Sequence, residues 1–429
     1  MVELRVRKAM CLGIAVCLGF GLSACDTKVA SEVEPATQSP TPSAYPSEAY
    51  VDGYNPPPEL SAEQLRRFRE APIYEMQEVS VPEQYTDSAV QKRPDWAAPN
   101  MADKDVIWAD DSGFLAEVPF SLDEVNKADR EGRPPTLPTR DVVWHGADGS
   151  ERKLLTLEGM DQICHVVGNG RFLVIASSIE GNLAPAEPVR VRLWDLQAGG
   201  DPVELVSAPE GNAFENGSFL YKSFLFDGDW LWFGYSQREK SNLDRYNLHT
   251  GEIQHIGESV KGSLAKWNGT VVTTALGAPG TDQVILRQYD SETGAPVPLD
   301  PRLEPMNRVD DIAATAHHLF VSETIYPTAP SYPTWVVPET GEPQITDLQS
   351  ERGSNFWWLE RSAGDYLAIS ANEGDFVLHA PSGKWFTVPR VGAPTIRGFV
   401  VGPMVYEPEP INKDIPRGEV DLSKLPPSL

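Results

Sequence analysis

The sequence has little of what metal centres, redox sites and nucleotide sites are built from. It has four cysteines and seven histidines in 429 residues. No two histidines have the helical spacing of a zinc-ligand pair, and no His-Glu-x-x-His, Cys-x-x-Cys, Gly-x-Ser-x-Gly, Walker or dinucleotide-binding glycine motif occurs. We therefore assign no catalytic, metal-binding or cofactor-binding residue, expect no cofactor, and favour a non-enzymatic function.

Basic charge is also scarce. Lys and Arg number 36 against 62 Asp and Glu, which gives a formal net charge of −26. A surface this acidic repels phosphate backbones, which argues against a nucleic-acid partner and against docking on anionic lipid through a basic patch. The direct consequence of the charge is solubility, and we expect a monomer.

An apolar run near the start, Ala9–Gly21, follows the basic residues Arg5, Arg7 and Lys8. As a helix it would be roughly 20 Å long, against the ~30 Å of a bilayer core. This is the size of the apolar region of a signal peptide, not of a membrane span. The run is followed by Leu22-Ser23-Ala24-Cys25.

This tetrapeptide resembles the lipobox of bacterial lipoproteins. The resemblance implies that residues 1–24 are a lipoprotein signal peptide and that Cys25 is the first mature residue and carries the lipid. Asp26 resembles the signal that keeps such proteins at the inner membrane. We therefore expect a lipid-anchored protein at the extracytoplasmic face of the bacterial cytoplasmic membrane; an ordinary signal peptide with a chance cysteine is the alternative.

Residues 25–58 are rich in Pro, Ser, Thr and Glu, and such a segment is expected to be a disordered tether. Residues 59–100 are expected to hold a short helix over 62–70, because Ser61 and Gln64 form a capping pair, and a strand over Ile73–Val81. The arginines of this helix are expected to face solvent. A second capping box at Ser121 predicts one helical insertion that ends at Gly132.

Residues 101–409 contain two kinds of turn that recur with one period. One kind precedes an apolar strand, as Asn268-Gly269 does, and the other follows a strand that carries alternate large residues. The second kind has its glycines at Gly149, Gly199, Gly251, Gly294, Gly341 and Gly383, a mean step of about 47 residues. Two hairpins per period form a four-stranded antiparallel blade.

The predicted fold is therefore all-β, a β-propeller of about seven four-stranded blades, with six or eight as alternatives. A stacked sandwich would not need turns that recur so regularly. The seventh unit lacks its outer strands at the C-terminus, so we expect the strand at Ile73–Val81 to complete it and residues 410–429 to form an extended tail. Closing the ring in this way removes an exposed sheet edge.

The turn Asp290-Ser291-Glu292-Thr293-Gly294-Ala295 and its relatives resemble blade turns of quinoprotein-like and YVTN-like propellers. In the quinoprotein family a tryptophan usually follows the turn and docks neighbouring blades. Only Gly383-Lys384-Trp385 has that arrangement here. The resemblance therefore implies the fold, and bound quinone is not expected.

Several polar and aromatic residues are site candidates by type, but structural roles are expected of them. Adjacent acids on a strand face opposite ways, so neither Asp110-Asp111 nor Asp310-Asp311 is an acid/base pair by itself. Turn formation is expected of His317-His318, an inert thiol of Cys164, and blade packing of the tryptophans Trp230, Trp232, Trp357 and Trp358.

The sequence thus predicts a lipid-anchored propeller that binds an envelope protein or an extracellular ligand. The alternative is an extracellular glycan-active hydrolase or lyase whose carboxylates come from several blades and converge in the central funnel.

Overall fold

The computed structural model describes only part of the 429 residues, most of it in the repeat region. The described residues are 62–80, 90–92, 105–110, 112–117, 127–128, 130–131, 133, 139–158, 162–178, 189–207, 224–237, 240–258, 263–277, 283–323, 334–346, 357–371, 374–387, 399–401, 404–406, 418–422, 425–427 and 429. No helix within these ranges is long and apolar enough to cross a membrane.

The first four sheets follow one another along the chain, and each has four antiparallel strands. Sheet 1 contains β4 (Asp105–Asp110), β5 (Gly113–Glu117), β6 (Arg140–Gly146) and β7 (Glu151–Leu157). Sheet 2 contains β8 (Gln162–Gly168), β9 (Phe172–Ser178), β10 (Val189–Asp195) and β11 (Val203–Ser207). Sheet 3 contains β12 (Phe224–Asp227), β13 (Trp230–Gln237), β14 (Lys240–Asn247) and β15 (Ile253–Gly257). Sheet 4 contains β16 (Leu264–Trp267), β17 (Thr270–Leu276), β18 (Val284–Asp290) and β19 (Pro296–Val297).

The next three sheets each include a strand from the N-terminal segment. Sheet 5 contains β20 (Val309–Ala314), β21 (His318–Glu323), β22 (Thr334–Pro338), β23 (Gln344–Thr346) and β1 (Ile73–Tyr74). Sheet 6 contains β24 (Trp357–Ala363), β25 (Tyr366–Ala371), β26 (Gly374–His379), β27 (Lys384–Thr387) and β2 (Gln77–Glu78). Sheet 7 contains β28 (Phe399–Val401), β29 (Met404–Tyr406), β30 (Gly418–Asp421) and β3 (Val90–Lys92).

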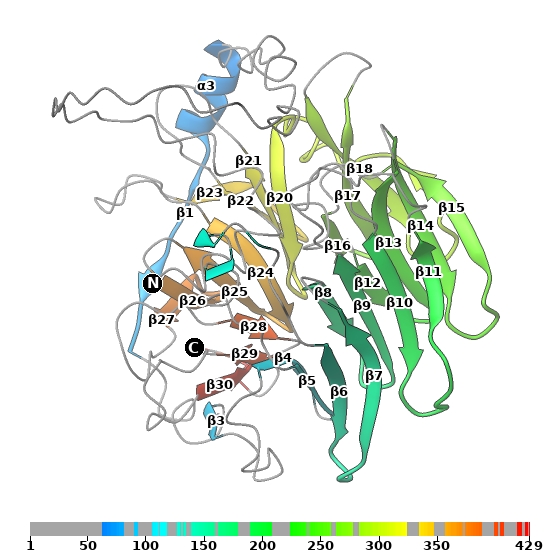
Figure 1. The fold of residues 1–429 in the computed structure, drawn as a ribbon. Coiled ribbons are helices and arrows are strands. Elements are labelled where there is room, and N and C mark those ends of the chain that lie inside the picture. The colour runs from blue at the N-terminus through cyan, green and yellow to red at the C-terminus, as the bar shows by residue number, and fades with distance from the viewer. Residues whose placement is uncertain are drawn as a thin grey trace, which may run out of the picture.

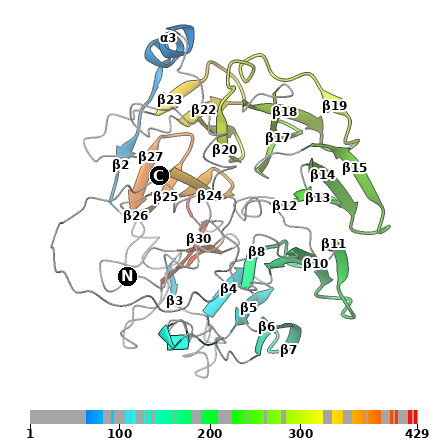
Figure 2. The same cartoon turned by 45° about the horizontal axis from the view of Figure 1, so that its top comes forward.

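The sheets are arranged in a ring (Figures 1 and 2). Their first strands contact one another in order from β4 through β8, β12, β16 and β20 to β24, and β28 of the last sheet returns to β4 of the first. The apolar clusters lie between adjacent sheets; one of them joins side chains of sheets 1, 2 and 3. A ring of sheets packed face to face, with the first strands innermost, is a β-propeller, so the predicted fold class is confirmed.

The predicted turns explain why these residues form hairpins. Asn268 and Gly269 both have positive φ, of 49° and 71°, as the type I′ turn between β16 and β17 requires. Gly251 and Gly294 have φ of 74° and 73°, and each donates its N–H to the carbonyl four residues earlier. All six glycines predicted for the second kind of turn have positive φ, which confirms the period read from the sequence.

An N-terminal segment, which we call the strap, runs along the outer edges of sheets 5, 6 and 7. The strap consists of the helix α3 (Ala62–Glu70) followed by β1, β2 and β3. β1 pairs parallel with β23, β2 pairs parallel with β27, and β3 pairs antiparallel with β30. The predicted helix over 62–70 is therefore confirmed.

The prediction that Ile73–Val81 completes the last sheet is wrong. That stretch holds β1 and β2, which extend sheets 5 and 6, and the closing strand is β3. Sheet 7 also does not lack both outer strands at the C-terminus, because β30 lies in the stretch expected to be an extended tail. The stretch expected to be one strand is two strands of two residues each, and they pair with two different sheets.

The end of the chain packs against sheet 6. Leu422 and Leu425 are buried beside Tyr366 and Phe386, and Val79 of the strap joins the same cluster. The Tyr366 hydroxyl donates to the Pro426 carbonyl at 2.5 Å. Sheet 6 is therefore the place where both terminal segments are held.

Gly383 provides a test of the strap contact. Its φ is +67°, and a Cβ there would overlap the Glu75 carbonyl oxygen of the strap, whereas Gly199, with φ +73°, has open space around it. We expect Gly199→Ala to lower the free energy of unfolding by about 1–2 kcal/mol for the backbone alone. Gly383→Ala should lose about 1–3 kcal/mol more through the clash.

Urea unfolding followed by tryptophan fluorescence compares the two variants. Equal losses would show that the strap does not rest against Gly383 in solution.

Candidate functional site

The two ends of the ring differ in the length of their connections. At one end, which we call the turn end, strands are joined by short turns such as 228–229, 268–269 and 364–365. The opposite end, which we call the loop end, is where the connections 118–139, 208–223 and 347–356 leave and re-enter the sheets. Binding residues are commonly carried by such connections on a rigid scaffold, so the loop end is the candidate functional site.

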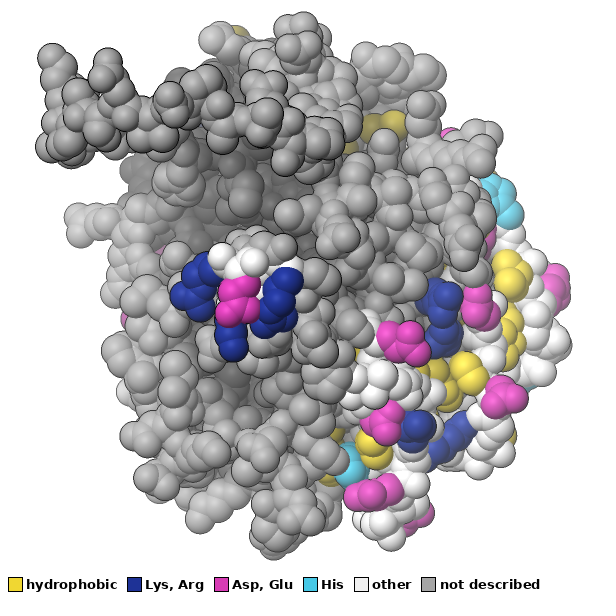
Figure 3. Space-filling model, viewed as in Figure 1, with side chains coloured by type: hydrophobic (Ala, Val, Ile, Leu, Met, Phe, Trp, Pro, Cys, Tyr) yellow, Lys and Arg dark blue, Asp and Glu magenta, His cyan; other side chains and the backbone are white. Residues whose placement is uncertain are grey.

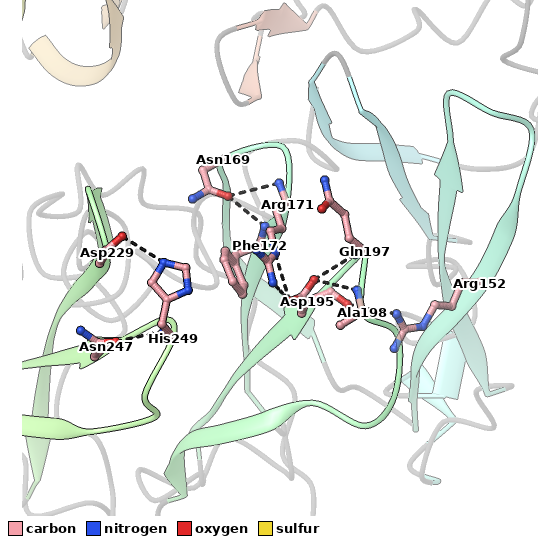
Figure 4. Close-up of polar contacts among 10 residues, drawn as sticks. All are labelled: Arg152, Asn169, Arg171, Phe172, Asp195, Gln197, Ala198, Asp229, Asn247 and His249. Carbon is pink, nitrogen blue, oxygen red and sulfur yellow. Dashed lines mark hydrogen bonds and ion pairs between the residues drawn. The ribbon is translucent and has the colours of Figure 1, made fainter.

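At the turn end the two turns of a sheet are tied together in sheets 1, 2, 3, 5 and 6. The Leu196 N–H donates to the Arg171 carbonyl in sheet 2, and the Leu248 N–H donates to the Asp229 carbonyl in sheet 3, both at 2.8 Å. Side-chain pairs reinforce these bonds, as Figure 4 shows: Arg171 contacts Asp195 at 2.7 Å and His249 contacts Asp229 at 3.0 Å. His317 and Glu339 repeat the arrangement in sheet 5 at 3.3 Å, which confirms the predicted turn role of His317.

Asp195 also shapes its own turn. Its Oδ1 accepts the N–H groups of Gln197 and Ala198 at 3.0 and 2.9 Å (Figure 4). The hydrogen bond from Arg171 holds the pKa of Asp195 below its ordinary value. Asn247 has the same capping role in sheet 3, where it accepts from His249 and Thr250.

Arginines join each of three sheets to the next. Arg245 of β14 donates to the carbonyls of Glu292 and Thr293 in the following sheet, both at 2.8 Å. Arg302 reaches the Pro338 carbonyl of sheet 5 at 2.7 Å, and Arg152 reaches the Gly200 carbonyl of sheet 2. These contacts replace the tryptophan docking expected of a quinoprotein-like blade.

Trp230 and Trp232 lie under the Arg245 side chain. The Arg245 guanidinium lies 3.8 Å from the ring centre of Trp230 and 5.3 Å from that of Trp232. Trp232 is fully buried. The predicted blade-packing role of these two tryptophans is confirmed, because both rings are committed to the contact between sheets 3 and 4.

At the loop end, α3 docks on sheet 5 through a buried carboxylate. Glu323 ends β21 and is 2% exposed. Its Oε2 accepts from Arg67 Nη2 at 2.8 Å and from Trp335 Nε1 at 2.7 Å, and its Oε1 accepts the N–H groups of Asn307 and Arg308. Phe68 packs on Trp335 with ring centres 5.4 Å apart, so the helix is fixed by one ion pair and one aromatic contact.

The environment of Glu323 acts on its pKa in two directions. Burial raises the pKa, and Arg67 with the three N–H donors opposes the rise. The net direction is upward, since almost no solvent reaches the group.

The expectation that the arginines of α3 face solvent holds for Arg66, which pairs with Glu63 and Glu70, and is wrong for Arg67.

Sheet 1 has a comparable pair at the loop end. Glu117 ends β5 and lies 3.8 Å from Arg140, which begins β6; both are buried. The helical insertion lies between these two residues in the sequence. Its residues Lys127, Ala128 and Arg130 are helical, as predicted, and Ala128 is buried. Figure 3 shows a group of Lys and Arg side chains around an acidic one, and Lys127 and Arg130 of the insertion are exposed.

The acids weighed as candidates join parts of the ring. Asp311, on an innermost strand, accepts from the Ser263 hydroxyl beside sheet 4 at 3.2 Å and from the Leu359 N–H of sheet 6 at 3.2 Å. Asp110 accepts from the N–H and hydroxyl of Ser112 within the first turn of sheet 1. Both carboxylates therefore have structural partners.

Other sequence candidates lie where the structure says less. Cys25, Asp26 and Asp111 are outside the described residues. Cys164 lies on β8 where the register shifts, and Trp357 and Trp358 lie on β24; the side chains of these three are not described. Within the described ranges, no three His, Cys, Asp or Glu side chains are grouped so as to hold a metal ion.

The residues that sequence analysis missed are arginines. Arg67, Arg152, Arg245 and Arg302 all contact an element far away in sequence. Arg245 lies on a strand that carries alternate large residues and precedes a predicted turn. The sequence therefore indicated where Arg245 lies within its own sheet. Its partners in the next sheet are backbone carbonyls, which carry no signature in side-chain type.

No protein-family model and no curated protein matches the chain. Among solved structures, it resembles a prolyl endopeptidase (16% identity, TM-score 0.42, 72% of this chain and 45% of that one). It also resembles the β-propeller domain of the Trilobed protease from Pyrococcus furiosus (12%, TM-score 0.37, 58% and 77%) and TolB from Acinetobacter baumannii (12%, TM-score 0.34, 73% and 97%). The chain spans less than half the length of the prolyl endopeptidase, and likenesses this distant carry no conclusion about activity.

Asp195→Asn isolates the ion pair with Arg171, because asparagine keeps the turn cap, as Asn247 does in sheet 3. The folded-state pKa of Asp195 is lowered, so its contribution to stability is present above the unfolded-state pKa and lost as pH falls through the folded one. We expect the variant to be less stable than wild type at pH 7 and equal to it in strong acid. Thermal midpoints from pH 2 to pH 7 measure the difference, and a gap that persists at the acid end would contradict the assignment.

Arg67→Ala tests the docking of α3. It leaves the Glu323 carboxylate buried without its cation, which should cost about 3–5 kcal/mol. A raised folded-state pKa contributes stability that is present at low pH and lost as pH rises, and removing Arg67 raises that pKa further. The deficit should therefore be larger at pH 8 than at pH 5.

Arg66→Ala is the matched control for Arg67→Ala, because Arg66 is exposed and pairs with Glu63 and Glu70 of its own helix. Urea unfolding at both pH values should show no measurable change for it. If Arg67→Ala lowers the free energy of unfolding equally at both pH values, the lost stability comes from the contacts of the helix and not from the charge on Glu323.

Proposed function

We propose that this protein is a membrane-anchored extracytoplasmic lipoprotein whose β-propeller binds a protein or another ligand through its loop end. The observation that carries the binding role is the asymmetry of the ring. Short turns at one end are tied to one another, as Arg171 and Asp195 are, while the long connections belong to the other end. A propeller with this division holds long connections on a rigid ring.

The use of the acids favours binding over catalysis. Asp311 joins sheets, and Glu323 fixes α3, so these buried carboxylates serve the scaffold. General acid/base work on a glycan needs a carboxyl pair facing a common cleft. Of the acids weighed for that role, Asp110 and Asp311 are instead engaged with hydroxyl and backbone donors.

The anchoring part of the proposal rests on the sequence Leu22-Ser23-Ala24-Cys25 after an apolar run. A two-chain lipid on Cys25 would give stable attachment, where one acyl chain gives marginal binding.

The strap adds a mechanical argument. Whatever precedes α3 is joined to the propeller through the buried Arg67–Glu323 contact, so a tether at this end would pull on the ring and not on a loose terminus.

Cys25→Ala is the test of the anchor. The wild-type chain, expressed in a bacterium grown with radiolabelled palmitate, should be labelled and recovered with membranes. The variant should be unlabelled and either secreted or retained as a precursor of higher mass. A variant that is still labelled, processed and membrane-bound would contradict the lipobox assignment; Cys164→Ala, which leaves the anchor untouched, is the control.

A further inference from the structure

The outermost strands of the sheets are protected against edge pairing, with one exception. Native proteins protect such strands with charge, proline or very short length. Among the described outermost strands, β7 carries Glu151, Arg152 and Lys153, β11 carries Glu204, and β3 carries Lys92. β19 begins with Pro296, and β1, β2 and β19 have two residues each.

β15 has none of these protections. Its five residues read Ile-Gln-His-Ile-Gly, without a charged residue of the Lys, Arg, Asp or Glu type and without proline. It pairs with β14 on its inner side and is the last strand of sheet 3. Ile253, at its start, is 50% exposed, one of the four large apolar side chains most exposed among the described residues.

The molecule itself shows that such edges accept an extended segment. The strap adds β1 to sheet 5 and β2 to sheet 6, both in parallel orientation. The backbone N–H groups of Gln77 and Val79 donate to Gly383 and Trp385 at 3.0 and 2.8 Å. Outer edges of this propeller can therefore bind a peptide through main-chain hydrogen bonds.

No described residue takes beside sheet 3 the space that the strap takes beside sheet 6. The Glu75 carbonyl rests against Gly383, the turn glycine of sheet 6. At the equivalent Gly251 of sheet 3, the Tyr246 hydroxyl, at 3.4 Å, is the only described group within 4 Å of a Cβ position. The edge of sheet 3 thus has the geometry of a strap site without a strap.

Charge decides what the occupant is. The exposed carboxylates Glu252 and Glu258 flank β15. Antiparallel pairing with a second copy would bring Glu252 toward Glu258 of the partner subunit, and each copy carries a net charge of −26. Like charges placed opposite each other are destabilising, so a second copy is disfavoured.

We propose that β15 is a docking edge for an extended segment of another protein, with an apolar, β-branched centre and a Lys or Arg at each end. The two basic residues lie about six positions apart, roughly 20 Å in a strand, and face Glu252 and Glu258. The segment extends sheet 3 as β1 and β2 extend sheets 5 and 6. This edge is separate from the loop end and does not depend on the anchoring proposal.

A fluorescein-labelled peptide, Lys-Val-Thr-Val-Thr-Val-Lys, tests the edge by anisotropy against the full chain. We expect it to bind at least about tenfold more tightly than the same peptide with Glu at both ends. Ile253→Lys, which adds the missing protection, should weaken binding about tenfold or more. The double variant Glu252→Lys/Glu258→Lys should reverse the preference and bind the Glu-ended peptide.

The matched control is Val203→Lys on β11, an exposed position on an edge that Glu204 already protects. It should leave the affinity unchanged, and near-ultraviolet circular dichroism should show that all variants remain folded. Equal affinity for wild type and Ile253→Lys would overturn the proposal, as would no binding at peptide concentrations on the order of 1 mM. A dimer in sedimentation experiments that Ile253→Lys dissolves would also overturn it, in favour of a second copy as the occupant.

Discussion

In the part of the ring whose side chains are described, strands carry apolar residues on both faces of their sheet, and both faces can be buried only if a neighbouring sheet packs on either side. Leu173 and Val174 of β9 lie on opposite faces of one strand, and both are fully buried. A chain of such sheets is stable only when the last one returns to the first. The contact of β28 with β4 meets this condition, and the strap makes it possible because β3 supplies the outer strand of the last sheet.

The strap does more than close the ring, and this follows from its path. One strand would suffice for closure, yet the segment begins at α3 on sheet 5 and lies along the outer edges of sheets 5 and 6 before it reaches sheet 7. The burial of Glu323 shows how firmly its beginning is held. A carboxylate at 2% exposure must be fully hydrogen-bonded, and one of its four donors is Arg67 of the strap. The helix is therefore part of the folded ring.

Periodicity allowed most of the fold to be predicted, because turn glycines report backbone conformation directly. Gly251 and Gly294 must be glycine to have φ near +74°, so their spacing marks the repeat without any knowledge of packing. The closing strand could not be predicted in this way. Ile73–Val81 and Val90–Lys92 are both short and weakly patterned, and the choice between them depends on the path of the strap around two other sheets.

The candidate site was predictable to a smaller degree, for a related reason. Sequence indicated that Trp230 and Trp232 share one strand face, but not that Arg245 covers them and holds carbonyls of the next sheet. It could assign Asp310 and Asp311 to opposite faces, but not the donors Ser263 and Leu359, which come from different sheets. Contacts between repeats depend on side chains that need not follow the repeat.

The distribution of charge gives the most direct view of what the surface is for. Buried charges in this protein are used inside the scaffold: Glu323, Arg245 and Asp311 each connect elements distant in sequence. Exposed charge protects outer strands, as Lys153 and Glu204 do on β7 and β11. An outer strand without such a charge needs a physical reason, since an unprotected edge favours aggregation unless something occupies it. β15 is that edge, and its flanking carboxylates would keep copies of this acidic protein apart while attracting a segment of opposite charge.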